Sequence, residues 1–245
     1  ISVRKAIAAV TPDIAKIIGK ANTCKYLFEP FGNFLSDETE IRIQALKRSD
    51  EFMSFLNNEE KIILFDKIFS NVKNSGVVWE IRHIAAKQIS AFVELLDRKT
   101  ISEKVASLFL ELINDSVYRV RFETTKNLGR LLNYFESVDP EYSTILEKQC
   151  SFFASSAMSS HRQLFIKICE NLLDVIPTKK FCEYYKKAIS LNGDKVVNVR
   201  ITLAAFLRRN RRFLEKLDYE KTKSTIEKLK KDVDIDVRNE CGIFK

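Results

Sequence analysis

The chain has 245 residues, of which 45% are hydrophobic and 30% are charged, and its formal net charge is +8. This composition excludes a disordered chain and a membrane-embedded one, and six glycines and four prolines are too few for the many turns of a β-sandwich or barrel. The basic balance permits attraction to acidic partners, RNA or anionic membranes, but a solvated basic surface is the simpler explanation.

An apolar residue followed by arginine recurs along the chain at a nearly constant spacing. The copies are Val3-Arg4, Ile41-Arg42, Ile81-Arg82, Val120-Arg121, His161-Arg162, Val199-Arg200 and Val237-Arg238, the fifth having histidine in the apolar position. Successive arginines are 38, 40, 39, 41, 38 and 38 residues apart. A period of about 40 residues is typical of HEAT and armadillo repeats and is longer than that of tetratricopeptide or ankyrin repeats.

Each interval accommodates two helices. In the copy around Arg121, apolar residues at Val105, Leu108 and Leu112 have helical spacing, a polar turn follows, and a second apolar stripe ends at Asp139-Pro140. The leading second helix is predicted at 3–18. The later pairs are predicted at 26–35 with 41–56, 60–72 with 78–96, 101–113 with 117–135, 142–155 with 160–175, 181–191 with 196–213, and 219–231 with 235–245.

These pairs predict repeats at 1–20 (partial), 21–57, 58–97, 98–136, 137–176, 177–214 and 215–245. No third short helix is apparent, which favours HEAT over armadillo repeats, and no linker or low-complexity segment interrupts the pattern. We therefore expect an all-α fold, an α-α superhelix of about six helix pairs plus one leading helix, forming a single domain over residues 1–245.

Acidic residues recur in the turn between the two helices of a repeat, six residues before the arginine. The pairs are Asp115 with Arg121, Asp194 with Arg200, and Asp232 with Arg238. In a stack, arginines of successive copies come into register with successive acids, so a half-buried ladder of charge-assisted pairs is predicted. A catalytic or phosphate-binding role for the arginines is the alternative. The ladder predicts that Arg121→Ala lowers thermal stability more than the surface substitution Lys230→Ala.

The chemistry of an enzyme is not apparent in the sequence. His83 and His161 are the only histidines and have no metal-ligand spacing, and there is no glycine-rich phosphate loop. The five cysteines are widely separated, which disfavours a zinc site or a disulfide framework and favours a reducing compartment. The sequence therefore predicts a non-enzyme without cofactor or metal. Neither a secretory signal nor a membrane-spanning run is recognisable, so we expect a cytoplasmic or nuclear location.

Several helix starts resemble those of a known family. They are the runs 114–121, 193–200 and 232–238, Trp79-Glu80-Ile81-Arg82, and Ser160-His161-Arg162. In order and spacing, these runs are similar to the C-terminal HEAT repeats of the protein phosphatase 2A scaffold protein, from residue 77 to the end. Glu80 stands where that family has a basic residue, and the net charge of +8 contrasts with the acidic family. A regulatory subunit of phosphatase 4 is the related alternative.

The resemblance implies a non-catalytic scaffold that binds a Ser/Thr phosphatase catalytic subunit through the turns between paired helices. In a fuller chain a regulatory B-type subunit would also bind. The implied partner-binding residues are Trp79, Val117, Tyr118, Ser160, His161, Val197, Asn198 and Asp234. The competing hypothesis is another HEAT adaptor, a transport receptor or a nucleic-acid-associated protein, suggested by the basic cluster Arg208–Arg212. Aromatic residues do not interleave with that cluster as stacking platforms require, so nucleic acid is not the expected partner. Membrane is not expected either, because no apolar run is long enough to span one.

Overall fold

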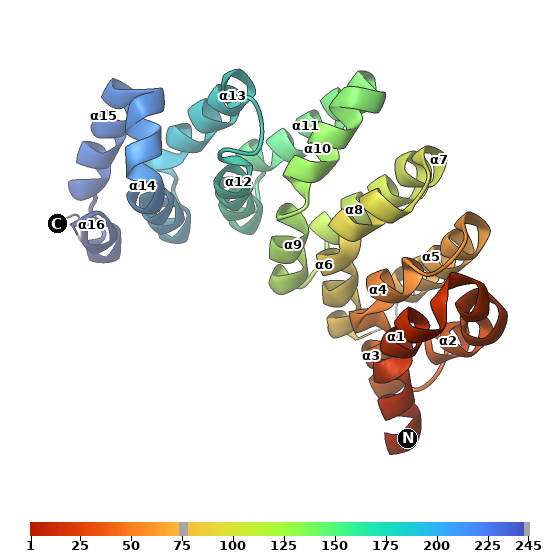
Figure 1. The fold of residues 1–245 in the computed structure, drawn as a ribbon. Coiled ribbons are helices and arrows are strands. Elements are labelled where there is room, and N and C mark those ends of the chain that lie inside the picture. Colours follow the sequence, from red (N-terminus) through yellow and green to blue (C-terminus); the bar gives the residue numbers. More distant parts are fainter. Residues whose placement is uncertain (74–77, 243–245) are drawn as a thin grey trace. The chain divides into compact units, whose positions relative to one another are not determined.

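The computed structural model describes residues 1–73 and 78–242, and every regular element in these ranges is a helix. The helices follow one another in pairs joined by short turns, in the order that the sequence predicts (Figure 1). The all-α solenoid prediction is thereby confirmed. By internal contacts the chain divides into two compact units, Ile1–Asn127 and Leu128–Lys245. The single domain over 1–245 stays a prediction.

The first unit contains four second helices and the first helices that belong to three of them. Its elements are α1 (Ser2–Asn22), a π-helical turn at Thr23–Leu27, α2 (Phe28–Phe34), α3 (Thr39–Lys47), α4 (Ser49–Met53), α5 (Asn58–Lys73), α6 (Trp79–Leu95), α7 (Arg98–Thr100), a second π-helical turn at Ile101–Val105, α8 (Ala106–Ile113) and α9 (Tyr118–Thr125). Aromatic rings fill the core between the paired helices of a repeat, with Phe31 stacked on Phe52 at 3.9 Å and Phe65 edge-on to Phe92 at 5.1 Å.

The second unit repeats the same pairing. Its elements are α10 (Leu128–Val138), α11 (Pro140–Phe152), a 3-10 turn at Phe153–Ser155, α12 (Ser159–Leu172), α13 (Thr178–Ile189), a 3-10 turn at Ser190–Gly193, α14 (Val197–Leu217), α15 (Tyr219–Lys230) and α16 (Ile235–Gly242). The second helices α12, α14 and α16 pack in sequence against one another, and the first helices α11, α13 and α15 lie on the other side (Figure 1). Residues 243–245, which belong to the last predicted helix, lie outside the described residues.

The helix predicted at 41–56 is interrupted at Arg48, which the apolar pattern did not indicate. Arg48 leaves the helical region (φ −130°, ψ 25°), and its guanidinium binds Asp13 and Glu51, each at 2.7 Å. The Leu46 carbonyl near the break accepts a hydrogen bond from Gln88 of the next repeat at 2.6 Å. The lost intrahelical bonding is thus replaced by a buried contact between repeats.

The helix predicted at 117–135 is also wrong as a single helix, because α9 ends at Thr125 and α10 begins at Leu128. The hydroxyls of Thr124 and Thr125 bond back to the carbonyls of Val120 and Phe122, at 2.8 and 2.7 Å. Such back-bonding from neighbouring β-branched residues weakens a helix and often bends it. The leading helix behaves as predicted, since Gly19 (φ 77°) breaks α1 directly after residue 18.

Candidate protein interface along the intra-repeat turns

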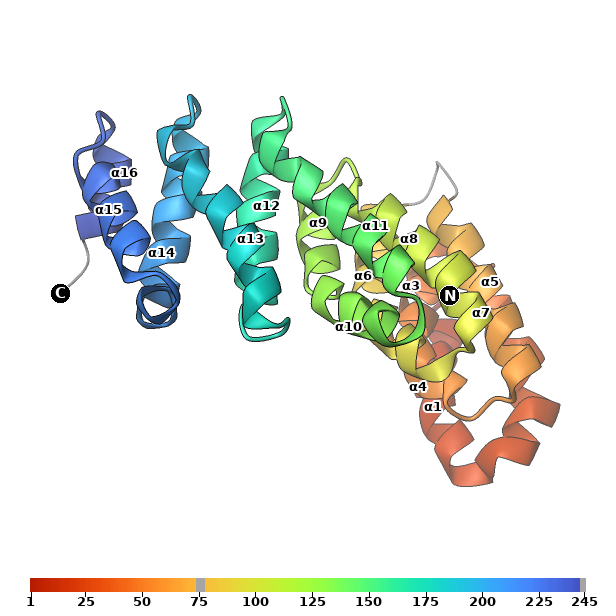
Figure 2. The same ribbon diagram turned by 90° about the horizontal axis from the view of Figure 1, so that it is seen from above.

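The turns between first and second helices carry most of the residues that the sequence singled out. In the second unit, these turns lie along one edge and the connections between repeats lie along the opposite edge (Figure 2). We call the turns and the first residues of the second helices the ridge, which in the described residues comprises 35–41, 78–82, 114–121, 156–162, 194–200 and 231–238.

Two ladder arginines of the second unit, Arg162 and Arg200, each hold two turns at once. The Arg162 Nε and Nη2 donate to the Asp194 carboxylate at 2.5 and 2.8 Å, while Nη1 donates to the carbonyl oxygens of Ser156 and Ala157 in its own turn. Arg200 does the same, reaching Asp232 at 2.6 and 2.8 Å and the Asp194 carbonyl at 2.6 Å. Each guanidinium therefore closes its own turn and binds the acid of the next repeat.

The first unit has the same ladder with less burial toward its beginning. Arg82 binds Asp115 at 2.5 and 3.1 Å, with side chains 20% and 6% exposed. Arg4 binds Asp37 at 3.0 and 3.2 Å and remains 47% exposed. The sequence predicted that arginines of successive copies come into register with successive acids. The structure joins Asp115, Asp194 and Asp232 each to the arginine of the preceding repeat. Arg82 and Arg162 are not among the predicted ladder residues, although the 40-residue period includes them.

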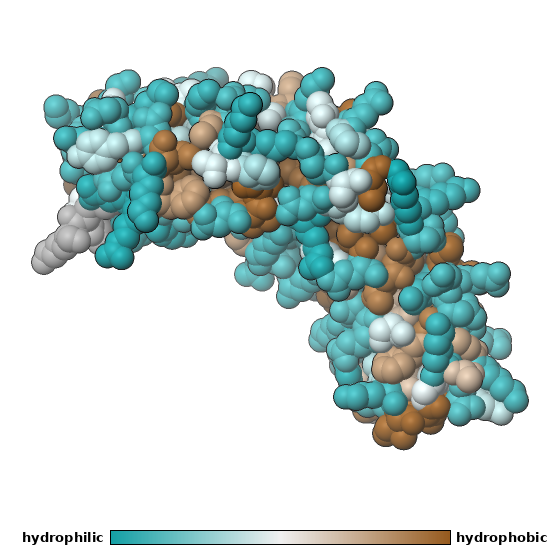
Figure 3. Space-filling view, turned by 45° about the horizontal axis from the view of Figure 1, so that its top comes forward, coloured by the Kyte–Doolittle hydropathy of each residue, from teal (hydrophilic) through white to brown (hydrophobic). Residues whose placement is uncertain are grey.

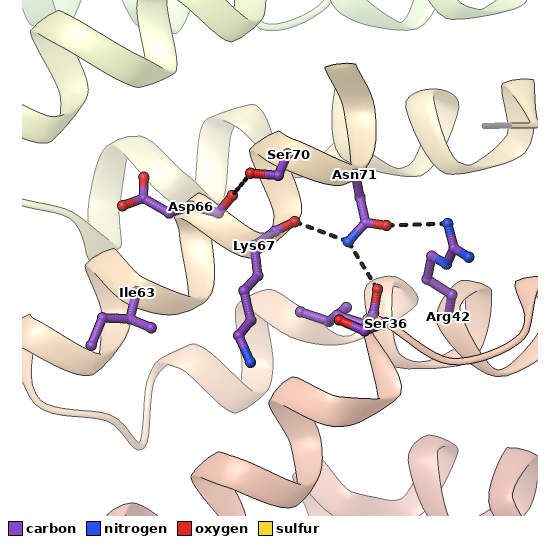
Figure 4. A pocket seen from close by; sticks show the side chains of 8 residues that line it. Ser36, Arg42, Ile63, Asp66, Lys67, Ser70 and Asn71 are labelled. Atoms are coloured by element: carbon purple, nitrogen blue, oxygen red, sulfur yellow. Dashed lines mark hydrogen bonds between the residues drawn. The ribbon is translucent and has the colours of Figure 1, made fainter. Parts of the chain in front are cut away.

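Two arginines of the first unit lack an acidic partner from a later repeat in the described residues. Arg42 donates to the Asn71 side chain at 3.2 Å and to the Asp37 carbonyl, next to a pocket of about 540 Å³ (Figure 4). The Asn71 amide in turn donates to the Leu35 carbonyl at 2.9 Å. Arg121 donates to the carbonyls of Asp115 and Ser116 at 2.7 and 2.8 Å, and its Nε is buried without a hydrogen bond among the described residues.

The last ladder arginine, Arg238, likewise closes its own turn. It donates to the carbonyls of Asp232 and Val233 at 2.6 and 2.9 Å. The acids also stabilise their turns, because the carboxylates of Asp115, Asp194 and Asp232 each accept the backbone N–H two residues later. Ser156 replaces an acid in this role and accepts from the N–H of Met158 at 3.2 Å.

The Arg200 guanidinium lowers the pKa of Asp232, aided by the Asp234 backbone N–H and opposed by burial. For Asp194, burial raises the pKa, but the hydrogen bonds from Arg162 and the Val196 N–H outweigh burial, so the net shift is downward. Both acids therefore bind protons less readily in the folded chain than in the unfolded chain.

The ladder predicts acid-sensitive stability in a defined direction. Because the folded-state pKa of Asp232 is depressed, its contribution to the free energy of unfolding is present above the unfolded pKa of about 4 and is lost as the pH falls through the folded value. We expect melting temperatures followed by circular dichroism to change little from pH 7 to 5 and to fall below pH 4. Asp232→Asn should start lower and fall less steeply; a slope equal to that of the wild type would contradict this.

The aromatic part of the ridge lies in the first unit. Tyr118 begins α9 and is 47% exposed, and Trp79 begins α6 and is half-buried. The Arg119 guanidinium lies 5.9 Å from the Trp79 ring centre, and Tyr118 stacks on Phe122 at 6.0 Å. One face of each ring is thus supported by its own unit. Val117, directly before Tyr118, is half-buried.

The ridge residues predicted in the second unit are less available. The His161 ring is 3.1 Å from the Ser156 hydroxyl and lies edge-on to Phe153, and Ser160 is half-buried beside it. Asp234 accepts the backbone N–H of Asp236 at 2.9 Å and so begins α16. Of the others, Val197 is half-buried, and only Asn198 is exposed.

The basic cluster is largely neutralised by neighbouring acids. Arg208 binds Glu240 at 2.6 Å, Arg209 binds Glu170 at 3.1 Å, and Arg211 binds Glu215 at 2.7 Å. Arg212 is exposed. A nucleic-acid groove needs cations that are available to phosphates, so these ion pairs count against that alternative.

No group of histidine, cysteine or acidic side chains that could hold a metal occurs in residues 1–73 and 78–242. The cysteines are unpaired, and burial raises the pKa of the Cys150 and Cys169 thiols. Among the helices described, none has the length and apolarity to cross a membrane. The visible face in Figure 3 is mainly hydrophilic, with separate hydrophobic patches.

Comparison with known proteins finds sequence similarity to a phosphatase regulatory subunit. The chain is 27% identical over 251 residues to serine/threonine-protein phosphatase 4 regulatory subunit 1 of Homo sapiens, and 26% identical to the same protein of Mus musculus and of Rattus norvegicus. These alignments cover 96% of this chain and 26% of each relative, so the chain spans about a quarter of their length. The similarity is to a phosphatase regulatory subunit and does not single out the protein phosphatase 2A scaffold.

No protein-family model matches the chain. Among solved structures, an engineered protein aligns over 88% of this chain and 95% of its own, with a TM-score of 0.43 and 14% identity.

Proposed function

We propose that this chain is a non-catalytic regulatory segment of a Ser/Thr phosphatase complex and binds the catalytic subunit through its ridge. The similarity to phosphatase 4 regulatory subunit 1 over 96% of the chain carries the proposal. It favours the catalytic subunit of phosphatase 4 no less than that of phosphatase 2A, whereas the B-type subunit rests only on the family resemblance.

The ridge supplies what such a complex requires. The arginine–aspartate pairs hold successive turns at a fixed spacing within each unit, so side chains on them form an ordered row. Aromatic residues are the types that most often anchor interfaces, and the ridge presents Trp79 and Tyr118 with the exposed Val78 beside them.

Co-purification tests the proposal. A tagged chain added to purified catalytic subunits of phosphatase 4 and phosphatase 2A should retain one or both of them on an affinity resin, and the expected partner is that of phosphatase 4. Ridge substitutions should abolish this retention. Failure to retain either catalytic subunit would overturn the proposed function.

A further inference from the structure

A groove between two consecutive first helices of the second unit has no role in the ladder or the ridge. It runs between α11 and α13, with a volume of about 530 Å³. The α11 residues that line it include Thr144, Lys148 and Ser151, and Ser155 of the following 3-10 turn continues the row. Because an α-helix rises 1.5 Å per residue, the part of this wall from Thr144 to Phe152 is roughly 12 Å long, enough for several residues of a bound peptide.

One end of the groove carries an exposed aromatic side chain. Phe152 is 67% exposed, whereas its neighbour Phe153 is 5% exposed and packs in the core. A phenylalanine that is largely in water costs free energy that burial by a partner would recover, about 25 cal/mol for each Å² covered. It therefore offers an anchor for an apolar side chain of a ligand.

The groove also carries positive charge that its own acids do not neutralise. Lys180 binds Glu147 at 2.8 Å, and Glu183 binds Lys186 at 2.7 Å, so these groups are paired. Lys148 and Lys187 line the same groove, and their ammonium groups form no ion pair or hydrogen bond with the described residues. The lining residues Lys148, Lys180 and Lys187 outnumber Glu147 and Glu183 by one, so the groove carries a net positive charge that complements an anionic ligand.

A third feature is the Tyr184 hydroxyl under the groove. The residue is 3% exposed, and its hydroxyl has no hydrogen-bond partner among the described residues. Burial is the main cause that raises the pKa of this phenol, and the nearby Ser151 hydroxyl is the one group that lowers it. The two hydroxyls do not meet the geometry of a hydrogen bond. An unsatisfied buried hydroxyl costs about 1–3 kcal/mol, so a ligand that accepted a hydrogen bond from it would recover that cost.

From these three features we propose that the α11–α13 groove binds a short acidic peptide segment of a partner protein. An apolar residue of the segment packs on Phe152, its carboxylates lie between Lys148 and Lys187, and a small movement lets Tyr184 donate to the segment. The site is separate from the ridge, and it does not depend on a phosphatase catalytic subunit.

The test begins with the purified 245-residue chain and a phage-displayed library of random twelve-residue peptides. We expect selected peptides to be enriched in aspartate and glutamate near a phenylalanine or leucine. Synthetic fluorescein-labelled copies should bind with Kd values of about 1–100 µM by fluorescence anisotropy. Peptides without acidic enrichment would overturn the proposal, as would tighter binding of a labelled RNA oligonucleotide at the same lysines.

Variants then localise the binding. Phe152→Ser and the double variant Lys148→Glu/Lys187→Glu should each weaken the selected peptide at least tenfold. The matched control is Tyr219→Ser/Lys223→Glu, which alters an exposed aromatic–lysine pair elsewhere in the second unit and should leave Kd unchanged. Equal effects in groove and control variants would overturn the assignment.

Tyr184→Phe separates ligand binding from folding. Removing an unsatisfied hydroxyl should leave the melting temperature unchanged or raise it, while weakening the peptide severalfold. A lowered melting temperature with unchanged peptide affinity would show a purely structural hydroxyl and would overturn the part of the proposal that assigns Tyr184 to the ligand.

Discussion

Arg162→Ala is expected to lower the free energy of unfolding by about 3–5 kcal/mol, the cost of leaving a buried charge without its partner. The Arg162 and Asp194 side chains are 8% and 6% exposed. Without the guanidinium, the Asp194 carboxylate loses two hydrogen bonds, and the carbonyls of Ser156 and Ala157 lose theirs. Urea unfolding followed by circular dichroism measures the change.

Two control variants separate this effect from the loss of any positive charge. Lys230→Ala removes a surface pair with Glu227, whose side chains are 40% and 51% exposed, and should change stability far less than Arg162→Ala does. Arg121→Ala should lie between the two, because Arg121 bonds to carbonyls and leaves no aspartate unpaired within its unit. If Arg162→Ala behaved like Lys230→Ala, the ladder would not stabilise the stack.

The double variant Arg162→Met/Asp194→Leu measures how much the ion pair itself contributes to the free energy of unfolding. A buried ion pair replaced by apolar residues of similar size often leaves a protein equally stable, whereas loss of one partner is costly. We expect the double variant to recover at least half of the loss seen in Arg162→Ala. A loss larger than that of the single variant would mean that the pair contributes net stability in addition to setting the spacing of the turns.

Periodicity predicted the helix pairs well because each repeat buries an apolar stripe at helical spacing and places arginine at the start of its second helix. The break at Arg48 was missed because the groups that stabilise it, Asp13 and Gln88, come from neighbouring repeats. The ladder between neighbouring copies was expected from their stacking, but the offset within one turn did not show which copy supplies each acid. In the structure, the bonded carboxylate lies 32 or 33 residues after its arginine.

The α11–α13 groove was not predictable. Phe152 and Phe153 are adjacent and chemically identical, and only the 3-10 turn after α11 decides which of them faces the core. Lys148 and Lys187 belong to different repeats. The sequence did not indicate that these two lysines lack an acidic partner whereas Lys180 has one. Trp79 and Tyr118 were singled out from the family resemblance and their place at the starts of second helices, and their role in partner binding stays a prediction.

Tyr118→Ala is expected to weaken binding of the phosphatase catalytic subunit by at least 2 kcal/mol, about 30-fold in Kd, if the ridge is the binding surface. Tyr118 is 47% exposed, so its loss removes little from the core. Trp79→Ala should have a similar or larger effect on binding. Because Trp79 is half-buried, the melting temperature of this variant must be compared with that of the wild type.

Arg119→Ala tests whether Arg119 only supports the Trp79 ring or itself contacts the catalytic subunit. Arg119 is exposed and lies against the Trp79 ring, so its removal frees the ring without altering the core and should weaken binding less than Trp79→Ala does. Tyr219→Ala is the matched control, since Tyr219 is 50% exposed at the start of α15, outside the ridge. Biolayer interferometry with an immobilised catalytic subunit gives Kd for each variant. Equal affinities for Tyr118→Ala, Trp79→Ala and Tyr219→Ala would exclude the ridge as the anchor, even if the chain still retained the catalytic subunit through another surface.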